Sequence, residues 1–384
     1  MNKSFEFTLP MLDIDYLDES GFRKVLLALV ETNSSDVFIK TGRPIAFKKN
    51  NKKQYVTKRV IREDELEYLM TKIMSSDIYH KIKNGTPMDS SYSIRLKEDG
   101  GSKQLPFRVH SGSFNRNKGV SLSIRTVNAK PLTYKQVGLE QSIVDAHLSA
   151  RKGLSLICGD TGSGKSTTQA ALNVEVLCQT DCHLLTYEDP IEIVYDNLDG
   201  ARTDCTQYQV GFDVPSYADG AIACLRQNPD YIQIGEIRDE RTMDASLTLA
   251  ETGHAVSGTV HVPRGFLVFS RVVNMFAPER QNFVKTRLAD MLNYIVFQDL
   301  TYRADGSRVA LREYLVVDNE VRKVLLECPM NKVSGLLHDF FESKGMLIEQ
   351  DAINKYEQGE IERPVLDELL QRYEGTKYDV ERAA

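Results

Sequence analysis

Long apolar runs are missing from this sequence. No stretch approaches the roughly 18 apolar residues that a membrane-spanning helix needs. The start of the chain carries acidic residues at Asp13, Asp15 and Asp18, and it lacks the basic segment and apolar core of a secretory signal. We therefore expect a cytosolic protein that contacts membranes only through protein partners.

Cysteine is sparse, and the chain has no excess of basic charge. Cys178 and Cys182 stand one helical turn apart, but no second Cys or His pair has a matching spacing, which favours reduced thiols over a structural zinc. The formal net charge of −6 argues against a dedicated nucleic-acid coat. No basic stripe interleaved with aromatic residues is present either. We expect no direct, sequence-specific binding to nucleic acid.

The 384 residues are enough for two or three domains, and 41% hydrophobic with 27% charged residues is ordinary for a soluble globular protein. The pattern predicts an extended lead-in over 1–20, an α+β domain over 21–128 and a linker over 129–137. The elements of that domain are expected at the helical patterns 20–30 and 63–84 and at the strand patterns 90–96, 107–114 and 121–127.

A second domain is predicted over 138–384. Short apolar segments separated by helical patterns predict a mostly parallel sheet with helices on both faces, and hence the α/β class. These segments are 154–158, 184–187, 232–235 and 255–262. From residue 300 onward we expect a hairpin formed by 308–317 and 320–326, followed by a helical part with patterns at 331–344, 349–357 and 364–373.

The stretch from Gly159 to Ser166 satisfies G-x-x-x-x-G-K-[ST], the loop that cradles nucleotide phosphates. An apolar strand pattern precedes it and a helical pattern follows it, which is the context that the motif requires. Lys165 is expected on the β- and γ-phosphates of ATP, and the Ser166 hydroxyl on Mg2+. A glycine turn that merely begins a helix is the alternative. The residues expected to bind the nucleotide are Gly159, Thr161, Gly162, Ser163, Gly164, Lys165, Ser166 and Thr167.

Two acidic segments follow predicted strands. Glu236 could orient or deprotonate an attacking water, and an exposed strand-end carboxylate is the alternative. Glu188 and Asp189 precede a proline and could hold Mg2+ through water, with Asp189 on the metal, and a solvated turn is the alternative. The carboxyl ends of parallel strands meet at one sheet edge, so these carboxylates are expected in one crevice with the phosphate loop.

The order of these segments resembles that of the secretion-ATPase superfamily. Its four signatures occur as Walker A at 159–166, an Asp box at 188–192, Walker B at 228–239 and a His box at 251–261. Within the superfamily the chain is similar to the PilT-like retraction motors and to the DotB and plasmid-conjugation TraJ ATPases of type IVB secretion. The segments 308–316 and 324–328 resemble the DotB branch in particular.

The resemblance implies a PAS-like N-terminal domain, a RecA-like P-loop ATPase domain and a hexameric ring with nucleotide between the two domains. Arg125 and Arg116 of the N-terminal domain would complete the site as cations near the transferred phosphoryl group. Arg271 would contact the nucleotide. His254 and His261 would relay the nucleotide state between domains. The implied partners are an inner-membrane secretion or conjugation complex and a second ATPase of that machine.

Two positions depart from the family pattern. Asp160 stands where proline is common, and Val262-Pro263-Arg264 follows the second histidine where Thr or Ser and then Asn are usual. These departures motivate one alternative, a nucleotide-gated assembly module with little turnover.

The sequence therefore predicts an ATP-hydrolysing, Mg2+-dependent hexameric motor of a type IV secretion or conjugation system at the cytoplasmic face of the inner membrane. A pilus retraction motor is the alternative within the same enzyme class. A DNA translocase is disfavoured by the acidic net charge.

Overall fold

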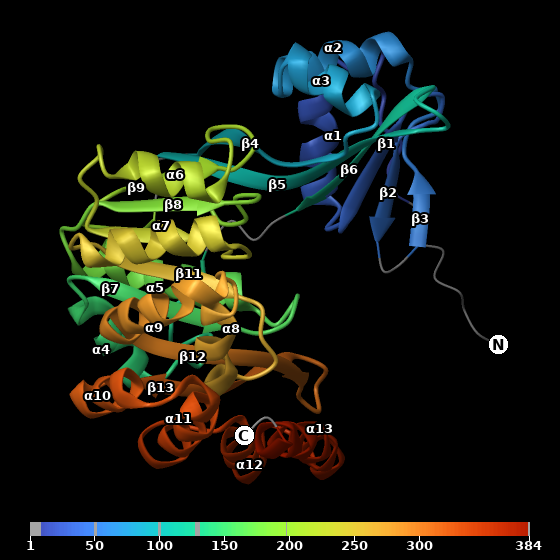
Figure 1. Cartoon of the computed structure of the whole chain (residues 1–384). Coiled ribbons are helices and arrows are strands. Elements are labelled where there is room, and N and C mark those ends of the chain that lie inside the picture. The colour runs from blue at the N-terminus through green and yellow to red at the C-terminus, as the bar shows by residue number, and fades with distance from the viewer. Residues whose placement is uncertain (1–8, 50–51, 99–100, 127–130, 197, 383–384) are drawn as a thin grey trace. The chain divides into compact units, whose positions relative to one another are not determined.

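The computed structural model describes residues 9–49, 52–98, 101–126, 131–196 and 198–382 (Figure 1). The first part of the predicted lead-in, 1–8, and the start of the predicted linker, 129–130, lie outside these residues. The chain divides into two compact units. The first comprises 1–129 with 189–194, and the second comprises 130–188 with 195–384.

The N-terminal unit is a six-stranded sheet with helices packed against it (Figure 1). Its strand order is β3-β2-β1-β6-β5-β4, and all neighbouring strands are antiparallel, which confirms the sheet predicted from the strand patterns. The strands are β1 (Asp36–Lys40), β2 (Ala46–Lys49), β3 (Lys52–Tyr55), β4 (Met88–Glu98), β5 (Gly101–Phe114) and β6 (Gly119–Thr126). The helices are α1 (Glu19–Glu31), α2 (Glu63–Ile73) and α3 (Ser76–Lys83).

Helix α1 begins where the sequence supplies a cap. The Asp18 carboxylate accepts a hydrogen bond from the Gly21 backbone N–H at 2.7 Å, which satisfies one of the first donors of the helix. The residues before it lack regular secondary structure, as the predicted lead-in requires, but they are part of the core. Leu9, Ile14 and Leu17 are buried with the apolar face of α1, because packing removes their apolar surface from water.

The C-terminal unit is built on a seven-stranded sheet with the order β13-β12-β7-β11-β10-β8-β9. Its strands are parallel except for the antiparallel edge pair β12–β13, which confirms the predicted mostly parallel sheet. The strands are β7 (Gly153–Cys158), β8 (Leu184–Glu188), β9 (Cys205–Gln209), β10 (Tyr231–Ile234), β11 (Ala255–Val260), β12 (Leu292–Tyr302) and β13 (Arg308–Val316). Strands β7, β10 and β11 are buried along their whole length, as central parallel strands are.

Helices cover both faces of this sheet (Figure 1). Helices α4 and α5 pack on one face, and α6 to α9 pack on the other. The helices are α4 (Gln141–Ser149), α5 (Lys165–Gln179), α6 (Tyr217–Cys224), α7 (Glu240–Glu251), α8 (Val268–Val273), α9 (Pro278–Met291), α10 (Asn319–Glu327), α11 (Met330–Lys344), α12 (Ile348–Glu357) and α13 (Arg363–Arg382). A short 3-10 turn, Gly265–Leu267, precedes α8. Helices α11, α12 and α13 correspond to the three predicted helical patterns of the C-terminal part.

The predicted hairpin between 308–317 and 320–326 is wrong. Strand β13 pairs with the preceding strand β12, whereas 320–326 lies in helix α10. The Asp318 carboxylate caps this helix by accepting from the Val321 backbone N–H at 2.8 Å. Val321 and Leu325, four residues apart, are both buried on one helical face, so the apolar spacing is helical rather than alternating.

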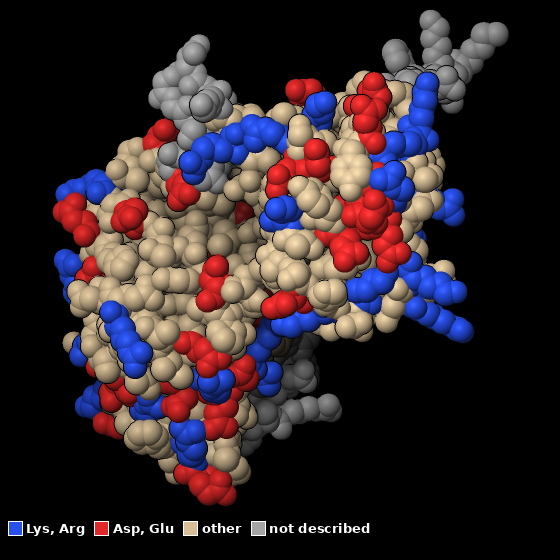
Figure 2. Space-filling view, turned by 90° about the horizontal axis from the view of Figure 1, so that it is seen from above, with Lys and Arg blue, Asp and Glu red and all other residues tan. Residues whose placement is uncertain are grey.

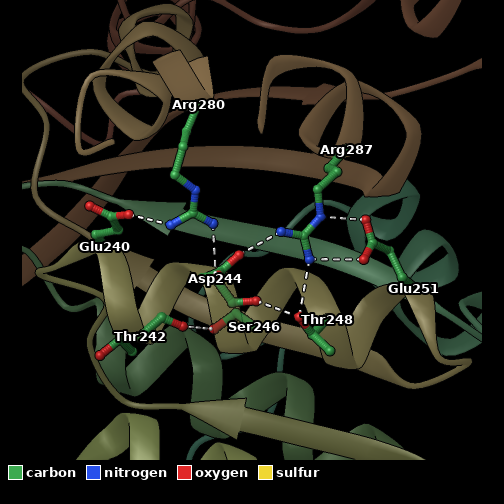
Figure 3. Close-up of polar contacts among 8 residues, drawn as sticks. All are labelled: Glu240, Thr242, Asp244, Ser246, Thr248, Glu251, Arg280 and Arg287. Atoms are coloured by element: carbon green, nitrogen blue, oxygen red, sulfur yellow. Dashed lines mark hydrogen bonds and ion pairs between the residues drawn. The ribbon is translucent and has the colours of Figure 1, made fainter. Parts of the chain in front are cut away.

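Helices α7 and α9 are joined by a network of ion pairs (Figure 3). The Asp244 carboxylate accepts from Arg287 at 2.5 Å and from Arg280 at 3.1 Å. Arg287 also pairs with Glu251 at 2.6 Å, and Arg280 pairs with Glu240. Because one carboxylate bridges two guanidinium groups, the network fixes the packing of α9 on the helix that follows Walker B.

Basic and acidic side chains lie interspersed on the face of the molecule shown in Figure 2. This mixture reflects the sequence, which has 48 basic and 54 acidic residues. No helix among the described residues is long and apolar enough to cross a bilayer.

Candidate functional site

The phosphate loop connects the central strand β7 to helix α5. Gly159 has a φ of +140°, and a Cβ at this position would lie 2.2 Å from the Gln298 carbonyl oxygen, so any side chain would collide with backbone. Gly164 precedes the helix in the left-handed conformation, with a φ of +86°. The first backbone N–H groups of α5 have no partners within the helix and form an anion-binding end.

Two side chains of the loop are buried. The Lys165 ammonium donates to the carbonyl oxygens of Gly159 and Asp160, each at 2.8 Å. Burial lowers the pKa of Lys165, and the nearby Glu236 carboxylate opposes that effect. The Ser163 hydroxyl makes no hydrogen bond within the described part of the chain, so it is a buried polar group that needs a partner.

Gln298 of strand β12 braces the loop from outside. Its side-chain amide donates to the Ser163 carbonyl at 2.5 Å, and its amide oxygen accepts from the Thr168 hydroxyl at 2.6 Å. The same oxygen accepts from Arg312 of β13 at 2.8 Å. Arg312 in turn donates to the Gly138 carbonyl at 2.6 Å, and burial lowers its pKa. The edge strands therefore hold the phosphate loop in place.

Glu236, Arg238 and His261 form a charged cluster at the carboxyl ends of β10 and β11. The Glu236 carboxylate lies 3.3 Å from His261 Nε2 and accepts from Arg238 at 2.5 Å. The Thr259 hydroxyl donates to the Gly235 carbonyl at 2.6 Å and ties the two strand ends together. The structure thus brings together two of the residues predicted to act in catalysis.

Glu236 is ionised at neutral pH. Burial raises its pKa, but the hydrogen bond and charge of Arg238, together with His261 and Lys165, outweigh that effect and hold the pKa below its ordinary value. The electrostatic coupling between Glu236 and Lys165 places the carboxylate in the same site as the phosphate loop. An ionised carboxylate there can orient a water molecule or accept its proton.

Glu188 ends strand β8, beside β10 in the sheet. Its carboxylate accepts from the Thr186 hydroxyl at 2.6 Å and from the Gln207 amide at 3.0 Å, which fixes its orientation. Asp189 follows it directly but is grouped with the N-terminal unit, so its predicted role on the metal stays a prediction.

His254 lies at the opposite end of the sheet from His261. It stands before the first residue of β11, and its ring Nδ1 contacts the Leu249 carbonyl at 3.0 Å. The seven residue steps from His254 to His261 span about 23 Å at roughly 3.3 Å per residue of strand. The structure therefore does not bring His254 to the cluster of Glu236 and His261 in the same unit, and its predicted role in relaying the nucleotide state stays a prediction.

The predicted arginines lie outside this cluster. Arg125 of β6 is largely exposed and donates to the Asp36 carboxylate at 2.8 Å, and Arg116 occupies a tight turn with a φ of +55°. Both belong to the N-terminal unit, so their predicted roles stay predictions. Arg271 lies on the exposed face of α8, and among the described residues no polar contact joins it to the phosphate loop.

A cavity of about 450 Å³ opens beside the phosphate loop within the C-terminal unit. Gly164, Thr167 and Thr168 line one side of it, and residues of the predicted linker, within 132–137, line another together with Gly138. Basic side chains complete the wall; they are Lys135, Arg303, Arg308, Arg312 and Lys355. A cavity of this size next to a phosphate cradle is suited to the nucleoside end of a nucleotide.

The donors fit a nucleotide with Mg2+. The unsatisfied Ser163 hydroxyl, the Lys165 ammonium and the helix end suit phosphate oxygens. The Ser166 hydroxyl is exposed at the start of α5, and hydroxyl, carboxylate and water oxygens are the ligands that Mg2+ prefers. Within the described residues, no group of three or more His, Cys, Asp or Glu side chains could hold a metal ion.

Three residues of the site were not predicted. Gln298 and Arg312 are more than 130 positions away from the loop that they support, and no local pattern marks them. Arg238 could have been found, because it stands two residues after Glu236 in a densely charged segment.

Comparison with known proteins gives consistent matches. The model of the type II/IV secretion system protein family matches residues 18–335. The type IV pilus retraction ATPase PilT of Pseudomonas aeruginosa is 36% identical over 222 residues, which cover 58% of this chain and 62% of that relative. The chain thus spans less than two thirds of the length of that relative.

Two solved structures match nearly the whole chain. The Legionella pneumophila ATPase DotB has a TM-score of 0.88 and 30% identity, and the match covers 95% of this chain and 99% of DotB. The pilus retraction motor PilT with bound ADP has a TM-score of 0.72 and 28% identity, covering 90% of this chain and 95% of that one. These likenesses confirm the α/β class, with an N-terminal domain followed by a RecA-like core. The PAS-like character of the N-terminal domain stays a prediction.

Proposed function

Because this chain belongs to the type II/IV secretion system protein family, as the predicted resemblance requires, we propose that it is an ATP-hydrolysing motor. It works as a hexameric ring at the cytoplasmic face of the inner membrane and energises a type IVB-like secretion or conjugative transfer system. Its partners are the inner-membrane complex of that system and a second ATPase.

One observation carries the enzymatic part of the proposal. Glu236 is held as a carboxylate by Arg238, touches His261 and is electrostatically coupled to Lys165 of the phosphate loop. A positioned base beside a phosphate-binding ammonium is the arrangement that hydrolysis of a phosphoanhydride needs.

Each residue then has a role. Lys165 and the N–H groups of α5 bind phosphate, and the cavity beside Thr167 takes the nucleoside. Ser166 and, through water, the carboxylates at the ends of β8 and β10 would hold Mg2+, which would supply positive charge to the phosphates. Glu236 orients the attacking water or accepts its proton, and Glu188 supports that edge.

The likeness to DotB over nearly the whole chain favours a role in type IVB secretion. Pilus retraction is the second candidate, and the identity with PilT supports it. Loss of transfer or secretion, with pilus-dependent motility retained, in a strain lacking this protein would favour the first; the reverse phenotype would favour the second.

The enzymatic proposal is tested by the Glu236→Gln variant. Removing the base should lower kcat for ATP by about 100-fold or more while ATP affinity stays within a few-fold, because the phosphate-binding groups are untouched. ATP turnover and nucleotide binding by titration are measured side by side. Glu279→Gln, an exposed residue of α9, is the matched control and should behave as wild type.

The same experiment tests the alternative of a nucleotide-gated module. If wild-type protein binds ATP but turns it over no faster than Glu236→Gln, then binding alone does the work. Asp160, which adds negative charge beside the loop, and the residues after His261 would then account for the low turnover.

A further inference from the structure

A buried ion cluster surrounds Arg264, which is completely inaccessible to solvent. Its guanidinium contacts the Glu313 carboxylate at 2.8 and 2.9 Å and the Glu349 carboxylate through two hydrogen bonds of 2.9 and 2.8 Å. It also lies 4.7 Å from the centre of the Phe266 ring, and its NH1 donates to the Tyr373 carbonyl at 3.5 Å. Two carboxylates and an aromatic ring therefore fix both the position and the plane of this one side chain.

The backbone segment from His261 to Gly265 connects this ion cluster to the site that contains Glu236. Arg264 stands three residues after His261, whose ring lies 3.3 Å from the Glu236 carboxylate. The backbone N–H of Gly265 donates to Glu313, so the main chain is fixed at the same point as the side chain. Val262 between them is buried. The segment that carries His261 thus has one end on strand β11 and the other in the cluster.

The other members of the cluster come from the C-terminal part of the chain. Glu313 lies in strand β13, Glu349 lies in the first turn of α12, and Tyr373 lies in α13. Glu313 is fully buried, whereas Glu349 retains partial exposure. A buried guanidinium that loses one of its two carboxylates keeps its full desolvation penalty. A movement of α12 that separated Glu349 from Arg264 would therefore act on the His261 segment.

We propose that Arg264 is a positioning residue for His261 and Glu236, and that the Arg264–Glu349 pair makes helices α12 and α13 a control on the rate of hydrolysis. With the pair closed, the His261 segment is held and the imidazole stays against the carboxylate. With the pair open, the imidazole is displaced and turnover falls. This inference rests on the proposed ATPase function.

The segment Val262-Pro263-Arg264, which departs from the pattern expected after His261, contains the central residue of this cluster. Arg264 is the last residue of this segment, which follows His261. It is a buried cation at the point where β13 and helix α12 meet this segment. A purely structural clamp, which holds α12 to the sheet without acting on the site, is the competing explanation.

A double-mutant cycle separates the two explanations. Glu349→Gln keeps the shape of the side chain and removes its charge, and it is measured alone and combined with His261→Ala. If Arg264 acts through His261, Glu349→Gln should lower kcat about three- to tenfold with KM for ATP unchanged, and should cause no further loss when His261 is absent. Glu349→Asp, which keeps the carboxylate, should retain an intermediate kcat.

Asp367→Asn is the matched control, because Asp367 of α13 forms an exposed pair with Arg363. Thermal unfolding of every variant shows whether the fold is kept. If Glu349→Gln lowers kcat equally with and without His261, or leaves kcat unchanged, the positioning role is contradicted. The pair would then only hold α12 against the sheet. A wild-type protein without turnover would overturn the proposed function together with this inference, whereas an active wild type unaffected by Glu349→Gln overturns the inference alone.

Discussion

The proposed catalytic residue is Glu236, and the neighbouring Arg238 controls the pKa of its carboxyl group. Arg238 donates to the carboxylate and is the main reason that the pKa of Glu236 stays below its ordinary value in spite of burial. A carboxylate with a depressed pKa remains available to a water molecule under more acidic conditions. It is a weaker base than an unpaired carboxylate would be.

Arg238→Gln should shift the pH dependence of hydrolysis. Without the guanidinium the pKa of Glu236 rises, so the ionised form is lost at a higher pH as the solution is acidified. The acid limb of kcat/KM should therefore move to higher pH. The pH–rate profile is the measurement, and Arg241→Gln, which removes a largely exposed guanidinium paired with Asp219, should leave the limb in place. An unmoved limb in Arg238→Gln would mean that another group controls it.

Residues of the phosphate loop could be predicted from sequence because their chemistry is local. The spacing of glycines, lysine and serine carries the geometry of the turn within eight positions. The role of Gln298 could not be predicted, because it depends on strand β12 lying beside β7 in the sheet. The positions of the two histidines of the His box follow from the strand between them: His254 precedes the first residue of β11 and His261 follows its last, so they lie at opposite ends of that strand.

At the scale of elements, the pairing of α7 with α9 depends on Asp244, which bridges Arg280 and Arg287 (Figure 3). Burial raises the pKa of Asp244, but hydrogen bonds from Arg287 and Arg280 outweigh this and depress it overall. A depressed carboxylate pKa stabilises the folded state above the unfolded pKa of about 3.9, and that contribution disappears as the pH falls through the folded value.

Asp244→Asn should lower the free energy of unfolding at pH 7 by about 1 kcal/mol, because one bridging charge between two arginines is lost. The difference from wild type should begin to shrink as the pH falls below about 3.9, where the unfolded carboxyl takes up a proton, and should vanish once the pH is below the depressed pKa of the folded state. Urea unfolding at a series of pH values measures both effects. Asp181→Asn, which breaks an exposed pair with Arg202, should show little change at any pH. A difference independent of pH would show that charge is not the cause.

Most helices and strands could be predicted because their apolar residues recur with a regular helical or strand spacing. The incorrect prediction for 320–326 also has a local explanation. Segment 320–326 is rich in β-branched and aliphatic residues and was assigned to a strand, although Asp318 and the four-residue spacing of Val321 and Leu325 indicate a helix. The extended lead-in agrees with the described residues before α1, but the sequence does not predict that this segment contributes to the core. Its apolar residues are buried one at a time, and irregular burial of that kind leaves no pattern in sequence.

For the whole molecule the open question is whether each site is shared between subunits. If Arg125 of one subunit completes the site that contains Glu236 of another, then Glu236→Gln and Arg125→Ala are defective in complementary ways. Mixed one to one, they should regain activity, because roughly a quarter of the sites in random rings contain both intact residues. If each site were built within one chain, mixing would restore nothing.

ATP turnover of the mixture is measured together with particle mass, with and without ATP. Arg43→Ala, an exposed arginine of the same unit, is the control for loss of charge. A ring that regains activity on mixing would establish shared sites. An active monomer that is indifferent to Arg125→Ala would contradict the ring mechanism and leave a P-loop ATPase of another kind.

The contact between Gln298 and the phosphate loop also has a consequence for folding during synthesis of the chain. The loop at 159–166 is synthesised more than 130 residues before the side chain that holds it. A nascent chain that ends before β12 carries all four family signatures but lacks the strand that lies against β7. Pairing between segments so far apart in the chain slows folding, because the closure of a long loop must precede it. Nucleotide that binds the folded domain stabilises it by mass action, and that stabilisation requires the complete chain through β12.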